Sequence, residues 1–183
     1  MPTPADAIET YMRAKDGNRP FLMQRAFAEN AALEMVVKTD AISFPSSAKG
    51  VAALADVLVR RFSLDYENVY TFCLNEPPAT PCRSFACHWL VGMSAKLGGA
   101  IRVGCGRYDW HFGADGRVER LVISVDVMKM LRPQKLSATM TWLSALPYPW
   151  CRADEAMTLM PASDGLAEIK AYLEQVRPLA PAA

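Results

Sequence analysis

AIRVGCGRYDWHF, GADG and RVERLVISVDVM, which together run from Ala100 to Met128, decide the fold of this chain. Asp115 and Gly116 tolerate positive φ, and both flanks alternate apolar with polar residues, so the stretch predicts two strands joined by a tight turn. Successive strand residues point to opposite faces of a sheet. One face of the first strand therefore carries Tyr108, Trp110 and Phe112, and the other carries Arg107, Asp109 and His111.

The segments on either side of this hairpin predict an α+β domain. Helices are expected over residues 4–16, 20–28 and 50–62, and strands over residues 31–38, 67–74 and 84–96. The strands that follow the third helix are consecutive, so they can pair as a meander without crossovers. After Leu131 the pattern is helical again. We therefore expect residues 1–131 to form the domain, and residues 132–183 to form a helical C-terminal extension packed on it.

Composition excludes several classes of protein. Twenty Lys and Arg face nineteen Asp and Glu among 183 residues, so the chain lacks the basic excess of a nucleic-acid-binding protein. It has no apolar run near the roughly twenty residues that span a bilayer, and no signal-like N-terminus. We expect a soluble, cytoplasmic protein without a nucleic-acid or membrane partner. Five cysteines without a C-x-x-C pair, and only two histidines, predict reduced thiols, no metal site and no cofactor.

Three short motifs, taken in order, carry a family resemblance. They are F-x-E-N-A at residues 27–31, K-G at residues 49–50, and G-R-Y…F…D-G-R-V in the hairpin. In this order the chain resembles the NTF2-like superfamily, with its SnoaL-like polyketide cyclases, ketosteroid isomerases, limonene-epoxide hydrolases and scytalone dehydratases, over roughly residues 4–130. The resemblance implies a curved antiparallel sheet that forms a cone around N-terminal helices, a pocket inside the cone, and a homodimer through the sheet.

The resemblance also implies positions for catalytic groups. It places Tyr108 where the isomerases have an oxyanion donor, and a phenol can donate to a carbonyl or enolate oxygen. It places Met35 where they have a general base, and Ile123 where the epoxide hydrolases have a catalytic Asp. Met cannot abstract a proton. The catalytic candidates are therefore Tyr108 as donor, with Asp40 or Glu34 as the replacement base.

The same resemblance predicts an apolar, aromatic pocket. Its expected ligand-binding residues are Trp110, Trp89, Phe112, Met35, Leu121 and Ile123. A two-residue turn at Gly98 and Gly99 would place Trp89 opposite Tyr108 and His88 opposite Asp109. His88 and Asp109 would then form an alternative acid-base pair, on the face away from the pocket. A register slip of one residue would exchange His88 and Trp89 between the faces.

Two functions from different classes are consistent with these residues. The first is binding of a small apolar or aromatic molecule, with acid-base catalysis of the cyclase, isomerase or dehydratase type. The alternative is a non-catalytic small-molecule-binding or assembly protein that keeps the pocket, which the apolar Met35 and Ile123 favour. A carboxylate or imidazole within roughly 5 Å of the Tyr108 hydroxyl would distinguish them, because proton transfer needs that reach.

Overall fold

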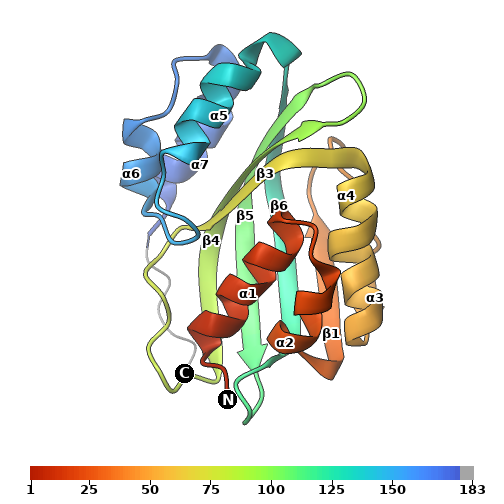
Figure 1. Cartoon of the computed structure of the whole chain (residues 1–183). Coiled ribbons are helices and arrows are strands. Elements are labelled where there is room, and N and C mark those ends of the chain that lie inside the picture. The colour runs from red at the N-terminus through yellow and green to blue at the C-terminus, as the bar shows by residue number, and fades with distance from the viewer. Residues whose placement is uncertain (178–183) are drawn as a thin grey trace.

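The frame of the molecule is one mixed sheet, shown by the computed structural model, which describes residues 1–177 (Figure 1). Within these residues the sheet has six strands in the order β2-β1-β6-β5-β4-β3. The strands are β1 (Phe27–Val37), β2 (Ser47–Lys49), β3 (Tyr66–Cys73), β4 (Ser84–Ala95), β5 (Ile101–Phe112) and β6 (Val118–Leu131). β1 pairs with β6 in parallel, and the other neighbours pair antiparallel. The predicted α+β class is confirmed.

Helices cover the inner face of this sheet (Figure 1). They are α1 (Pro4–Asp16), a 3-10 turn η1 (Pro20–Leu22) with α2 (Met23–Ala26), and a continuous helical run of α3 (Val51–Ala55), the π-helical η2 (Asp56–Arg61) and α4 (Phe62–Asp65). Thr3 caps α1 in a reciprocal box with Asp6, as its position before Pro4 predicts. The helical run carries the apolar stripe expected of it, with Leu54, Leu58 and Phe62 buried.

The predicted boundary between the second helix and the first strand is wrong: the helix ends two residues early and the strand begins four residues early. The helix was expected to reach Ala28 and the strand to begin at Ala31, whereas the backbone is already extended at Phe27. Phe27 is fully buried, pairs with Val118 across the sheet, and packs edge-on against Tyr11 with ring centroids 5.6 Å apart. These long-range contacts end the helix early, and local propensity does not record them.

The turn between β4 and β5 also differs from the prediction. Four residues, Lys96 to Gly99, form it, because the Lys96 amide donates to Asp65 O (2.8 Å) and the ladder resumes with Ala95 N donating to Ala100 O (2.8 Å). Trp89 consequently lies opposite Gly106, and His88 lies opposite Arg107. The register shift is two residues. It preserves the faces, and Trp89 points inward as predicted.

A second group of helices covers part of the outer face of the sheet (Figure 1). After η3 (Pro133–Lys135) come α5 (Leu136–Ser144), α6 (Ala153–Thr158), η4 (Asp164–Leu166) and α7 (Ala167–Gln175). They bury the outward apolar row Ile101, Val103 and Cys105 of β5 in a second core with Trp142 and Leu143. The division of the chain at residue 131 stays a prediction, and residues 178–183 of the predicted extension lie outside the described residues.

Residues 1–177 contain neither a membrane-spanning helix nor a cluster of metal ligands. None of the helices there has both the length and the apolar character that a membrane crossing requires. In the same residues, no three His, Cys, Asp or Glu side chains come together in an arrangement that could hold a metal ion. All five cysteines are free thiols.

Candidate functional site

A cavity lies between α1, the helical run α3–α4 and the inner face of the sheet. Its free volume is about 50 Å³. The lining is almost wholly apolar and includes three methionines, Met35, Met93 and Met128. Methionine is unbranched and changes shape easily. Ile42 and Phe44, from the loop between β1 and β2, close one side, with Phe44 stacked on Phe62 at 6.4 Å.

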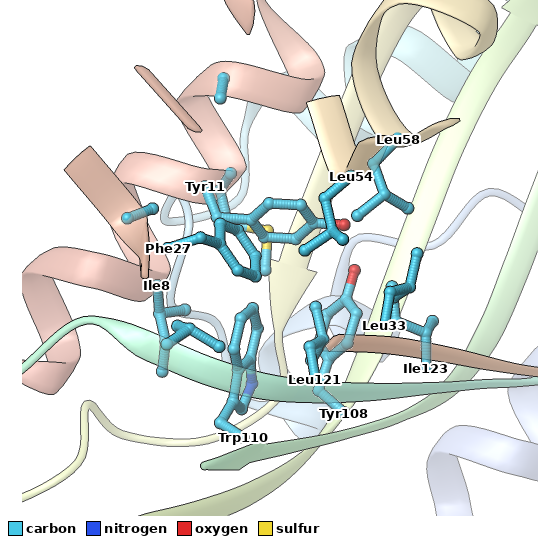
Figure 2. Packing of buried hydrophobic residues seen from close by; sticks show 14 of the residues in the cluster. Ile8, Tyr11, Phe27, Leu33, Leu54, Leu58, Tyr108, Trp110, Leu121 and Ile123 are labelled. Carbon is cyan, nitrogen blue, oxygen red and sulfur yellow. The ribbon is translucent and has the colours of Figure 1, made fainter. Parts of the chain in front are cut away.

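Only some of the predicted ligand-binding residues line this cavity. Met35, Trp89 and Ile123 do, together with the predicted donor Tyr108. Trp110 and Leu121 point to the same inner face but are buried deeper in the core (Figure 2), and Phe112 is buried in the same core. Trp110 fills that part of the cone because it packs against Tyr11 and Tyr108, with ring centroids 5.5 and 5.1 Å away.

Two phenols meet at the wall of the cavity. Figure 2 shows the hydroxyls of Tyr11, on α1, and Tyr108, on β5, pointing toward one another, and their rings are edge-to-face with centroids 6.3 Å apart. Among the described residues the buried Tyr11 hydroxyl has no partner with hydrogen-bond geometry, and neither has the Trp89 indole N–H. Burial raises the pKa of both tyrosines well above the usual value. Both therefore stay protonated at neutral pH and can donate.

A buried ionic cluster forms another part of the wall. Lys15 Nζ donates to Thr71 Oγ1 at 2.7 Å and pairs with Asp16 Oδ1 at 2.8 Å. Asp16 also accepts from the Thr71 amide (2.7 Å), the Thr71 hydroxyl (2.8 Å) and the Tyr148 hydroxyl (3.1 Å). Lys15 and Thr71 line the cavity, whereas Asp16 does not.

The carboxylates predicted as bases lie elsewhere. Glu34 is on the outer face, half-exposed, in an ion pair with Arg120 at 2.8 Å. Asp40 lies in the loop that closes the cavity, but it faces an outer groove next to Tyr66 and Arg102. Within residues 1–177, no Asp, Glu or His side chain lines the cavity.

The alternative pair His88 and Asp109 is not brought together. His88 Nδ1 lies 2.8 Å from the hydroxyl of Tyr172 on α7, and Asp109 accepts from Arg107 Nε at 3.0 Å. Both contacts are on the outer face, where the sequence placed these residues. The pairing failed because the turn is two residues longer than predicted, which moves Arg107 opposite His88.

Three polar residues of the cavity wall were missed from the sequence: Tyr11, Lys15 and Thr71. Tyr11 and Lys15 are four residues apart on a helix, so they share one face, and this spacing was the available signal. The same spacing also fits ordinary burial of one helix face, so it does not by itself indicate a cavity. Only the packing of α1 against β3 shows that both side chains border free space.

Comparison with known proteins identifies the fold. No protein-family model and no curated protein matches the chain. The solved structures that are similar include a computationally designed 17-OHP binder (TM-score 0.55, 16% identity, 71% of this chain and 100% of that one). They also include RV0760c from Mycobacterium tuberculosis (0.55, 14%, 72% and 98%) and Δ5-3-ketosteroid isomerase from Mycobacterium sp. (0.55, 14%, 71% and 100%). The chain thus has the NTF2-like fold that the order of its motifs predicts.

Proposed function

We propose that the protein binds a small molecule with an apolar or aromatic body and an acceptor oxygen, in the cavity beneath α1. The observation that carries this proposal is the converging pair of buried phenols, Tyr11 and Tyr108, of which Tyr11 lacks a partner in the described chain. An unpaired buried donor costs about 1–3 kcal/mol. A ligand oxygen placed between the two hydroxyls would remove that cost and accept two hydrogen bonds.

The free space indicates a ligand that reshapes the cavity as it binds. About 50 Å³ is well below the roughly 150 Å³ of a cavity that holds benzene. The walls that would move are the Met35, Met93 and Met128 side chains and the Phe44 ring, none of which is held by a hydrogen bond. A solved neighbour, RV0760c, is described in complex with estradiol-17beta-hemisuccinate. A free volume of about 50 Å³ favours a ligand smaller than a steroid.

The arrangement favours binding over acid-base catalysis. Tyr11, Tyr108 and the Trp89 indole are donors, and abstraction of a proton needs a base within hydrogen-bond reach. Glu34 is engaged on the opposite face of the sheet. A catalytic pair of Tyr108 with Asp40 is the second candidate, because the loop that carries Asp40 also contributes Phe44 to the cavity.

The test is a titration of protein labelled with methyl-¹³C methionine, using acetophenone and ethylbenzene. These probes differ by the carbonyl oxygen. We expect acetophenone to shift the methyl signals of Met35, Met93 and Met128 and to bind more tightly than ethylbenzene by about tenfold, the usual value of one buried hydrogen bond. In Tyr108→Phe the advantage should shrink. Equal affinities in the wild type, or no shift of these methyl signals, would refute the proposal.

We also propose a homodimer through the uncovered part of the outer face, in a reducing cytoplasmic environment. β1 lies there, with Val36 44% exposed, and in the described chain neither α5 nor α7 packs extensively against this strand. Five free cysteines fit a reducing compartment. Light scattering at micromolar concentration tests the dimer, and a monomer mass would exclude it.

A further inference from the structure

Lys15 has an unused donor at the cavity. Its side chain is 8% exposed, and two of its three N–H groups are taken by Thr71 Oγ1 and Asp16 Oδ1. For the third N–H the described residues offer no oxygen acceptor. The ammonium also contacts the ring of Phe62, whose centroid lies 4.8 Å from Nζ. One N–H group of the ammonium therefore remains available to donate a hydrogen bond to a ligand.

The carboxylate that balances this charge is turned away from the cavity. Asp16 accepts hydrogen bonds from the Thr71 amide, the Thr71 hydroxyl and the Tyr148 phenol, besides the ion pair with Lys15. Asp16 itself does not line the cavity, and these four contacts occupy its oxygens. A ligand in the cavity would meet the cation of the pair and would be separated from the anion.

The remaining polar groups at the wall are also hydrogen-bond donors, like the Lys15 ammonium. The hydroxyls of Tyr11 and Tyr108 and the indole of Trp89 are donors, and the Thr71 hydroxyl already gives its hydrogen to Asp16. A buried carboxylate needs a cationic partner and several donors before its burial is favourable. Hydrogen bonds from an ammonium to a carboxylate are about twice as strong as those between neutral groups.

From these contacts we infer that the ligand is a small apolar carboxylate, and that Lys15 selects it over a neutral molecule of the same shape. The inference rests on the proposed function, since it concerns the same cavity. The carboxylate takes the third N–H of Lys15 together with a phenol one helical turn away, Tyr11. The competing interpretation is that Lys15 and Asp16 form a structural pair that no ligand contacts.

Benzoate and benzamide test the inference, because they share a shape and differ in charge. By the methionine-methyl titration, we expect the wild type to bind benzoate about tenfold more tightly than benzamide, a difference of about 1.4 kcal/mol. In Lys15→Met, which keeps the length of the side chain without its charge, the ratio should fall to about one. Lys170→Met, on the exposed side of α7, is the matched control and should keep the wild-type ratio.

Lys15→Met leaves Asp16 without its cation and can prevent folding. The double variant Lys15→Met/Asp16→Asn is therefore measured in parallel, and the affinity ratio of whichever variant folds tests the inference. The inference is overturned if the wild type does not prefer benzoate, or if the preference persists when the charge of Lys15 is removed. In both cases binding of acetophenone would leave the proposed function standing. If acetophenone, benzoate and benzamide all fail to shift the methyl signals, the proposed function and the inference both fail.

Discussion

The phenol of Tyr148 donates a hydrogen bond to the carboxylate of Asp16 across 3.1 Å, joining residues 132 positions apart in the chain. The same C-terminal segment adds to the free edge of β3, where Cys73 N donates to Pro149 O (2.7 Å) and Cys151 N donates to Cys73 O (3.1 Å). The predicted extension is thereby tied to the helix that carries Tyr11 and Lys15. Through Asp16, the C-terminal segment stabilises the part of the cavity wall that Lys15 forms.

Asp16→Asn should lower the free energy of unfolding by about 2–4 kcal/mol, because it leaves the buried Lys15 ammonium without its anion. Tyr148→Phe, the milder change, removes one of the four hydrogen bonds and ion-pair contacts of Asp16 and should cost about 1 kcal/mol. Urea unfolding followed by tryptophan fluorescence measures both. Equal losses in the two variants would show that the ion pair with Lys15 contributes nothing to stability.

Tyr11→Phe should stabilise the protein by about 1 kcal/mol while it weakens binding of acetophenone. The hydroxyl is buried without a partner in the described chain, so its removal relieves an unmet desolvation cost. Tyr172→Phe is the control: its hydroxyl contacts His88 Nδ1, Gly106 O and Asp126 Oδ2 at 2.8–3.1 Å, and its loss should destabilise by about 1 kcal/mol. Thermal unfolding of the two variants checks the opposite signs.

Gly106→Ala should destabilise by about 3 kcal/mol, since an added Cβ would lie 1.9 Å from Ser124 O and 2.5 Å from the Trp89 ring. Trp89 reaches the cavity by lying over this glycine. Gly98→Ala, in the turn, meets no atom within 4 Å and should cost only about 1 kcal/mol for its positive φ of 76°. Comparable losses in chemical denaturation would mean that the close packing of Trp89 on β5 is wrong.

The stability of the protein should fall as the pH drops through about 6.5, in part because of His88. Burial, and then the neighbouring Arg107, lower the pKa of His88 in the folded state. The unfolded chain therefore takes up this proton at a higher pH than the folded protein does, and protonation favours unfolding. Urea unfolding at pH 7.5 and 5.5 should show a smaller loss in His88→Gln than in the wild type. An equal loss in both proteins would exclude the contribution of His88.

The sequence by itself determined which residues of each strand share a face. Alternation along a strand is a local property of the extended backbone, so Tyr108, Trp110 and Phe112 fall on one face from the residues alone, and the family resemblance implied that this face points inward. The turn chemistry of Asp115 and Gly116, and the cap at Thr3, are local in the same sense. The NTF2-like fold was expected from the resemblance that three ordered sequence motifs carry.

Only the tertiary structure decided what borders the cavity. Tyr11 and Tyr108 are nearly a hundred residues apart, and their hydroxyls converge because α1 packs across the sheet (Figure 2). The length of the turn after β4 depends on a hydrogen bond from Lys96 to Asp65, which no local pattern encodes. From the sequence, Asp16 is predicted only to be the last residue of a helix. It becomes the acceptor of a buried cluster only once β3 and Tyr148 are packed around it, because burial and charge pairing are properties of the folded chain.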